Sequence, residues 1–202
     1  MSRTNTLIAA LSAAILAAPA MAQEQGATAE QEEQPAGQIL DMGQPADDGP
    51  KVGDRYSKEK FGDWDLACIK VNQGEDPCSL LQILKDDKGN PMAEFSLFRL
   101  KEGGQAVAAA TVIVPLETLL PAQLTISIDG APGKRYQYSF CNPIGCVAQI
   151  GLTQADVDAM KNGKEAIISL VPAPAPTQVI KLKVSLKGFT AGYDKVDVVE
   201  NR

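Results

Sequence analysis

Residues 140–148 constrain the fold of this chain more than any other stretch. Cys141 and Cys146 bracket four residues, and two of these four, Pro143 and Gly145, are turn formers. Proline fixes φ near the value that a turn needs, and glycine adopts a positive φ without steric cost. Strand-like runs lie on both sides. This pattern predicts a β-hairpin closed by a disulfide, which requires an oxidising compartment.

The first 22 residues have the features of a secretory signal peptide. Arg3 supplies a positive charge, residues 7–18 form a short apolar run, and residues 20–22 (Ala-Met-Ala) fit an A-x-A cleavage site. A run of about 12 apolar residues is too short to cross a bilayer core, which needs roughly 20. Cleavage is predicted between Ala22 and Gln23, and no cysteine follows it that could carry a lipid anchor. We therefore expect a periplasmic or secreted protein without a transmembrane segment.

The net charge of −6 is distributed unevenly along the chain. Residues 23–54 hold eight acidic residues and one basic residue, whereas residues 55–202 hold 17 of each sign. The acidic stretch has few aromatic or β-branched residues, so we expect residues 23–55 to be a disordered acidic linker. An acidic tail that binds a basic partner is the alternative. Because the rest of the chain is neutral and has no basic patch, nucleic acid is not an expected partner.

Residues 56–194 alternate between short strand-like runs and turn-forming residues. Strands are predicted at residues 61–68, 78–85, 92–100, 106–114, 123–128, 135–141, 147–150, 166–171 and 179–186. The apolar run 106–114 is typical of a strand buried on both faces, and the proline-rich residues 172–176 predict an exposed, stiff connector.

One helix is predicted over residues 153–162, with Thr153 as N-cap and Asp156 in the capping-box position. Eight or nine short strands with one short helix predict an all-β, antiparallel β-sandwich. We assign residues 56–194 to this domain and residues 195–202 to a C-terminal tail.

The four cysteines allow three pairings. Cys68 ends one predicted strand and Cys78 begins the next, so hairpin geometry favours Cys68–Cys78 together with Cys141–Cys146. The alternative pairs cysteines between the two hairpins, as a bridge between sheets. A C-x4-C spacing differs from the C-x-x-C of thiol oxidoreductases, and an exported, oxidised protein seldom keeps four thiolates for zinc. We expect no metal and no cofactor.

The chain contains no histidine. This excludes Ser-His-Asp and Cys-His mechanisms and histidine-based metal sites. There is no G-x-S-x-G motif, phosphate-binding loop or dinucleotide fingerprint. The remaining candidate pairs are Asp63 with Asp65, Ser185 with Lys187, and Ser57 with Lys58. Adjacent acids on the outer face of a strand are ordinarily solvated charges, and we expect no catalytic residues and no enzymatic activity.

The order of the short motifs matches a known family. Residues 61–64 (Phe-Gly-Asp-Trp) precede Cys68 and Cys78, and residues 141–148 and 184–191 follow. Between them lie Val114-Pro115, Leu120-Pro121 and Ile128-Asp129-Gly130. Over residues 57–193 the chain resembles the invasion-associated locus B (IalB) family of exported alphaproteobacterial proteins. The resemblance implies an immunoglobulin-like β-sandwich with no established enzymatic activity. The family takes its name from entry of a pathogen into host red cells.

We therefore expect an exported, non-catalytic protein that binds another protein or an envelope component through sandwich edges or loops. A structural envelope protein without a discrete ligand is one alternative. A histidine-independent hydrolase that uses carboxylates or a Ser-Lys pair is another. Residues 187–190 are a candidate recognition loop, although a glycine turn followed by a buried Phe189 is the favoured interpretation.

Overall fold

The computed structural model describes residues 41, 43, 44, 46, 49–101 and 104–199. The elements discussed below all belong to the unit that begins at Ala46. The predicted signal peptide, with its cleavage site between Ala22 and Gln23, lies outside the described residues, as does most of the predicted linker 23–55.

The larger of two β-sheets contains eight strands. They are β1 (Arg55–Phe61), β2 (Trp64–Ile69), β3 (Cys78–Lys85), β4 (Pro91–Leu100), β5 (Ala108–Val114), β8 (Phe140–Asn142), β9 (Gly145–Leu152) and β12 (Val198–Val199). Their order is β1-β2-β3-β4-β5-β9-β8, with β12 beside β4. All neighbours are antiparallel except β12 and β4, which run parallel.

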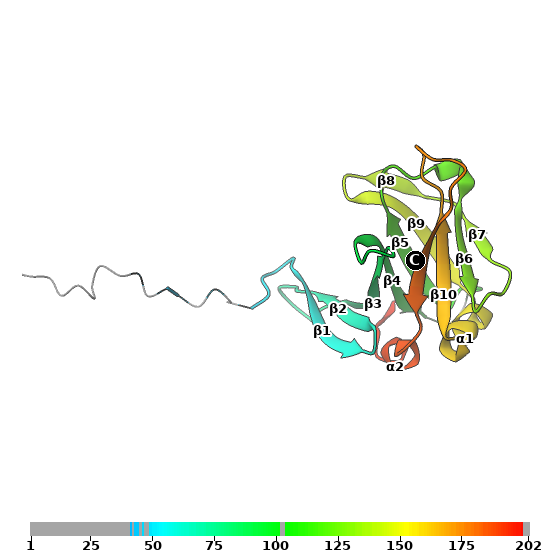
Figure 1. The fold of residues 1–202 in the computed structure, drawn as a ribbon. Helices are drawn as coiled ribbons and strands as arrows, with labels where there is room; N and C mark the ends of the chain where they lie inside the picture. The colour runs from blue at the N-terminus through cyan, green and yellow to red at the C-terminus, as the bar shows by residue number, and fades with distance from the viewer. Residues whose placement is uncertain (1–40, 42, 45, 47–48, 102–103, 200–202) are drawn as a thin grey trace, which may run out of the picture. The chain divides into compact units, whose positions relative to one another are not determined.

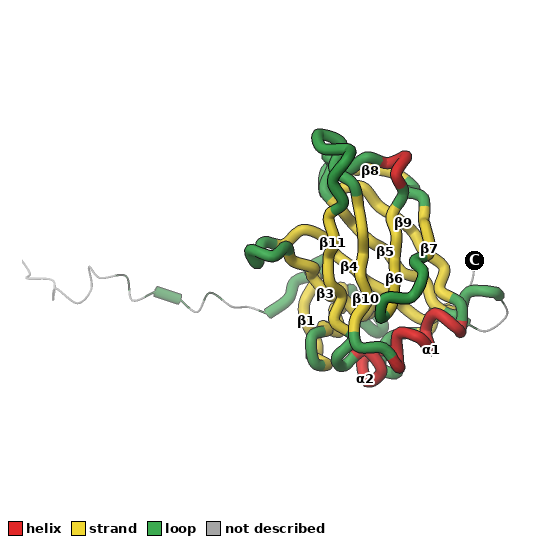
Figure 2. The backbone as a smooth tube through the Cα atoms, turned by 45° about the vertical axis from the view of Figure 1, so that its right-hand side comes forward, coloured by secondary structure: helices red, strands yellow, loops and turns green. Residues whose placement is uncertain are grey.

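The smaller sheet contains four antiparallel strands in the order β11-β10-β6-β7. They are β6 (Leu124–Ile128), β7 (Lys134–Tyr136), β10 (Glu165–Leu170) and β11 (Ile180–Ser185). Figure 1 and Figure 2 show this sheet facing the larger one, with the helices α1 (Gln154–Asn162) and α2 (Phe189–Tyr193) at the lower end. The predicted antiparallel β-sandwich is therefore confirmed.

The core lies between the two sheets and is supplied by alternate residues of the strands. In β5, four residues are buried, and the residues between them are only partly covered: the buried ones are Ala108, Ala110, Val112 and Val114. Because successive side chains point to opposite faces of a strand, this alternation identifies the inner face of the sheet. The prediction that residues 106–114 are buried on both faces is wrong, since the outer face of β5 is partly exposed.

A buried polar network joins the two sheets where β11 approaches β3. Gln82 lies on the inner face of β3, and its Nε2 donates hydrogen bonds to the carbonyl oxygens of Asp63 and Ser185, each at 3.1 Å. Gln82 Oε1 accepts a bond from the Ser185 N–H at 2.8 Å. The Trp64 Nε1–H also donates to the Ser185 carbonyl, at 2.8 Å. Because buried polar groups require partners, these bonds fix the position of one sheet relative to the other.

The indole of Trp64 is also the centre of an aromatic cluster. Its ring lies 5.7 Å from the ring of Phe95 and 5.4 Å from that of Phe189, centroid to centroid, in inclined arrangements. All three side chains are buried. Phe95 comes from β4 and Phe189 begins α2, so the cluster connects the larger sheet to a C-terminal element.

Two glycines allow the backbone segments behind this cluster to cross. Gly62 and Gly188 have φ values of 59° and 86°, in the region that favours glycine. A Cβ atom at Gly62 would lie 2.5 Å from the carbonyl oxygen of Lys187, and one at Gly188 would lie 2.1 Å from that of Phe61. The interpretation of residues 187–190 as a glycine turn with a buried Phe189 is confirmed.

The structure differs from the sequence prediction at both ends of the sandwich. Residues 61–68 were predicted as one strand, but the turn at Gly62 separates β1 from β2. Strand β1 was missed because it is an exposed edge, with charged residues at 58–60 in place of apolar alternation. Residues 195–202 were predicted to be a tail, yet Val196 is buried and β12 pairs with β4.

The predicted helix is confirmed as α1. Thr153 is its N-cap, and the Thr153 and Asp156 side chains form the reciprocal capping box. The helix α2 was not predicted, because its five residues are too few for a periodic pattern.

The backbone crossing predicts a specific stability difference between two glycine substitutions. Gly188→Ala should lower the free energy of unfolding by at least about 3 kcal/mol, because it adds a backbone clash to the strain of a positive φ. Gly89→Ala is the matched control: Gly89 has the same φ of 86°, but nothing lies within 4 Å of its Cβ position. It should cost only about 1–2 kcal/mol. Urea unfolding measures both, and equal losses would contradict the steric role of the crossing.

Candidate functional site

The structure joins both cysteine pairs that hairpin geometry favours. Cys68 and Cys78 are directly opposed on β2 and β3, and Cys141 and Cys146 are opposed on β8 and β9. The Cα atoms are 4.0 Å apart in each pair. Each bridge therefore closes one hairpin within the larger sheet, and neither connects the two sheets.

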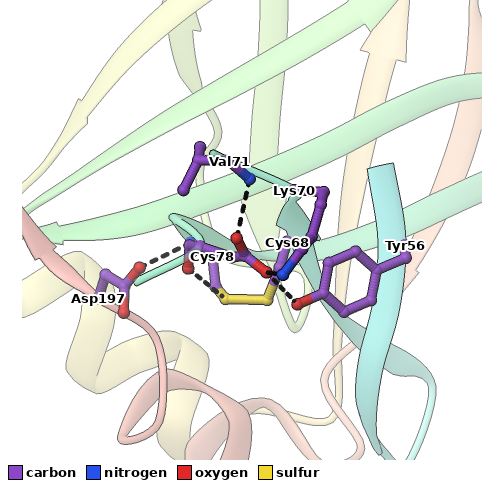
Figure 3. The surroundings of a disulfide bond; sticks show 7 residues. Tyr56, Cys68, Lys70, Val71, Cys78 and Asp197 are labelled. Atoms are coloured by element: carbon purple, nitrogen blue, oxygen red, sulfur yellow. Dashed lines mark hydrogen bonds and ion pairs between the residues drawn. A yellow bond between two sulfur atoms is a disulfide. The ribbon is translucent and has the colours of Figure 1, made fainter. Parts of the chain in front are cut away.

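A carboxylate cluster lies beside the Cys68–Cys78 disulfide, as Figure 3 shows. Asp76 accepts hydrogen bonds from the Val71 N–H at 2.8 Å and the Tyr56 hydroxyl at 2.7 Å. Its carboxylate also pairs with Lys70 Nζ at 3.2 Å. These contacts hold the pKa of Asp76 at about 2, with the Val71 bond contributing most and the Tyr56 bond next. The cluster ties the loop between β2 and β3 to β1.

The C-terminal segment contacts the same loop. The Asp197 carboxylate accepts a hydrogen bond of 2.6 Å from the Cys78 N–H, and the Arg99 N–H donates to the Asp197 carbonyl at 3.1 Å. Asp76 thus contacts both backbone and side chains of its surroundings, whereas the Asp197 carboxylate bonds to the backbone of β3. Their arrangement ties the β2–β3 hairpin to β1 and to the C-terminal segment.

Asp63 and Asp65, the candidate paired carboxylates, each accept a hydrogen bond from a serine. Asp63 accepts a 2.6 Å bond from the Ser185 hydroxyl, and Asp65 accepts a 2.7 Å bond from the Ser57 hydroxyl. Each carboxylate therefore has its own serine partner on a different element.

The serine hydroxyls of the two candidate Ser-Lys pairs also have other hydrogen-bond partners. The Ser185 hydroxyl accepts a bond from the backbone N–H of Lys187, at 3.3 Å, while it donates to Asp63. The Ser57 hydroxyl donates to Asp65. A Ser-Lys mechanism needs the lysine amine beside the hydroxyl, and in both pairs the hydroxyl is bonded to other groups.

Among the described residues, the carboxyl groups with shifted pKa values are all shifted downward. Backbone and side-chain hydrogen bonds lower the pKa of Asp76, Asp86 and Asp129. Burial raises the pKa of Asp156, but bonds from Lys134 and Thr153 outweigh it and lower the pKa overall. A carboxylic general acid needs a raised pKa instead. Within the described ranges, no group of three or more acidic or cysteine side chains is placed to hold a metal ion.

A small cavity of about 150 Å³ lies beneath α1. Its lining is mainly apolar and includes Phe95, Leu152 and Met160. The only charged groups among its lining residues are Lys134 and Asp156, whose side chains pair with each other at 2.5 Å. The cavity therefore offers a space for an apolar group but no converging acid and base.

The strongest candidate site is the end of the sandwich opposite α1 and α2, which we call the apolar loop end. It consists of three segments, residues 115–123, 140–146 and 171–179. Figures 1 and 2 both show them gathered at the top of the molecule, around the β8–β9 hairpin.

Specific contacts hold the three segments together. The Leu119 N–H donates to the Val171 carbonyl at 2.8 Å, and the Ala173 N–H donates to the Glu117 carbonyl at 2.7 Å. Segment 140–146 is attached to the first segment through the pairing of Cys146 with Val114, at the end of β5. Segments that are distant in sequence are thus held next to one another at this end of the sandwich.

The loop end exposes large apolar side chains. Half of the most exposed large apolar side chains in the described part of the chain belong to it: Leu116 at 55%, Leu120 at 40%, Phe140 at 49%, Ile144 at 72% and Val179 at 58%. Single exposed apolar residues are normal, but several of them gathered at one end of a molecule indicate a candidate contact site.

The loop end is also nearly free of charge. Its segments of 9, 7 and 9 residues contain one charged side chain, Glu117. Charged residues make up 22% of the whole chain. Sequence reasoning predicted the hairpin and the exposed proline connector separately, and it missed their meeting because only the fold brings them together.

The low pKa of Asp76 predicts how stability depends on pH. Folding favours the ionised carboxylate, so the stabilisation is present above about pH 4 and is lost as the pH falls toward 2. Asp76→Asn should lower the urea midpoint at pH 7, and its difference from the unaltered protein should shrink as the pH is lowered to 2. Glu75→Gln, in the same loop but making none of these contacts, is the control. A difference that stays constant with pH would contradict this role of Asp76.

No helix of the described segments is long and apolar enough to cross a membrane. A family model described as invasion associated locus B (IalB) protein matches residues 64–197. Two invasion protein B homologs of Brucella abortus, from strain 2308 and from biovar 1 strain 9-941, are each 25% identical over 142 residues. These alignments cover 70% of this chain and 80% of each relative.

A solved structure supports the same fold. The crystal structure of invasion associated protein B from Bartonella henselae has a TM-score of 0.56 and 22% identity to this chain. The match covers 68% of this chain and 92% of that chain. The family model spans the sandwich from Trp64 in β2 to Asp197 before β12, and the chain belongs to the invasion associated locus B family.

Proposed function

We propose that this protein is a non-catalytic binding protein that acts outside the cytoplasm, in the cell envelope or its exterior. The observation that carries the proposal is the apolar loop end, where three segments with a single charge expose five large apolar side chains. Such a surface is costly to leave in water, and the free energy falls when a partner covers it. We assign it as the contact surface.

Three features support a location outside the cytoplasm. The two disulfides require an oxidising compartment. The sequence predicts a signal peptide that is cleaved before Gln23. The third is the family to which the chain belongs, since its proteins are extracytoplasmic. The Brucella and Bartonella relatives are named for invasion, a process that requires contact with other molecules.

The chemistry of the polar residues supports a role without catalysis. The chain has no histidine, and the serine hydroxyls of both Ser-Lys candidates donate to aspartates. The shifted carboxyl groups favour their ionised forms, as expected for side chains that cap turns and loops. A structural envelope protein without a discrete ligand is the alternative function, and it differs by having no saturable partner.

Capture from an envelope extract tests the proposal. The immobilised protein should recover a partner in a saturable manner, and the double variant Leu116→Asp/Ile144→Asp should reduce recovery by about tenfold, because it places charges in the apolar contact. Val52→Asp is the matched control, since Val52 is 56% exposed and the segment before β1 lies away from the loop end in both views.

The outcomes separate the alternatives. Equal recovery by the double variant would show that the contact surface lies elsewhere. Recovery that never saturates would favour the structural alternative. Removal of residues 23–54 should leave recovery unchanged, and a loss of recovery would instead assign binding to the acidic linker.

A further inference from the structure

About half of the residues of the apolar loop end present no free backbone N–H that would need a hydrogen bond from a partner. Six of its residues are prolines, which have no N–H: Pro115, Pro121, Pro143, Pro172, Pro174 and Pro176. Seven other N–H groups donate within the loop end, those of Leu119, Ala122, Gln123, Ile144, Ala173, Ala175 and Gln178. Each donor that is absent or satisfied internally lowers the cost of entering a medium that lacks hydrogen-bond acceptors.

The exposed side chains are spread over separate loops. Leu116 and Leu120 belong to the first segment, Ile144 to the hairpin tip and Val179 to the third segment. One groove of about 290 Å³ reaches the loop end, where Ile144 and Pro115 line it, but Leu116, Leu120 and Val179 do not. A rigid protein partner would need a matching pocket for each separate side chain, whereas a fluid apolar layer accommodates them all.

The charge of the loop end indicates which kind of apolar layer, anionic or zwitterionic at its surface, it would enter. Glu117 is its single charged residue, and no lysine or arginine is present in the three segments. Proteins that bind anionic membranes carry basic residues beside their apolar contact. The loop end lacks these residues, so its charge complements a surface without net charge, such as a zwitterionic headgroup layer.

We propose that the apolar loop end inserts reversibly into the interfacial region of a lipid bilayer with zwitterionic headgroups. This inference rests on the proposed function and names the partner of the same surface. The disulfide Cys141–Cys146 holds the hairpin that carries Ile144, and the bonds between segments 115–123 and 171–179 hold the other apolar side chains beside it. The contact is peripheral, because only side chains and loop tips enter the layer.

Flotation with vesicles of phosphatidylcholine tests the inference. The protein should float with these vesicles, and the bound fraction should change little when the salt concentration is raised or phosphatidylglycerol is added. Leu116→Asp/Ile144→Asp should lower the vesicle partition coefficient by about tenfold or more. Val52→Asp should leave it unchanged. Circular dichroism spectra matching those of the unaltered protein would confirm that the variants are folded.

A tryptophan reporter tests which side chains enter the layer. Trp64 is the single tryptophan of the chain and is buried, so it gives a constant background. The fluorescence of Ile144→Trp should shift to shorter wavelength when phosphatidylcholine vesicles are added, because the indole leaves water. Val52→Trp should show no shift.

Contrary results would overturn the inference in identifiable ways. No flotation, or flotation that requires phosphatidylglycerol and is abolished by salt, would exclude insertion into a zwitterionic interface. Equal losses of vesicle binding for the double variant and Val52→Asp would show that the loop end does not contact the bilayer. If vesicle binding fails while capture of a protein still depends on Leu116 and Ile144, the proposed function stands and only the bilayer assignment is wrong.

Discussion

The sandwich depends on the close crossing of two backbone segments, one around Gly62 and the other around Gly188. Their Cβ positions would fall 2.5 and 2.1 Å from carbonyl oxygens of the opposite segment, so a side chain at either point would clash with the backbone. The crossing places Trp64 against Phe189 and brings Ser185 within hydrogen-bond reach of Gln82. The crossing therefore links the β1–β2 turn, the relative position of the two sheets and the position of α2.

This crossing explains why the family motifs say more about the fold than about a ligand. Residues 61–64 and 184–191 are the two segments that cross, and each places a large aromatic side chain, Trp64 or Phe189, in the core. The apolar loop end lies at the opposite end of the sandwich and takes one of its segments from the hairpin motif 140–146. Because the core is stabilised elsewhere, the loops at this end can expose apolar side chains without weakening the sheets.

Sequence reasoning reached the features that arise locally. Alternation in strands such as β11, the capping box at Thr153 and the turn chemistry between Cys141 and Cys146 each depend on neighbouring residues. It missed β1, whose exposed charges hide the strand pattern, and β12, whose pairing with β4 depends on a distant partner. The apolar loop end was missed for the same reason as β12, because it depends on contacts between distant segments. Its three segments acquire meaning only when the fold brings them together.

The central claim is that the apolar loop end is the surface through which the protein makes contact. Hydroxyl-radical footprinting of the protein, with and without an envelope extract, tests it most directly because the radical modifies exposed apolar side chains. We predict that Leu116, Phe140, Ile144 and Val179 lose reactivity in the extract while Val52 and Val198 keep theirs. Unchanged reactivity at the loop end, together with protection of Ile83 on the outer face of the larger sheet, would contradict the claim.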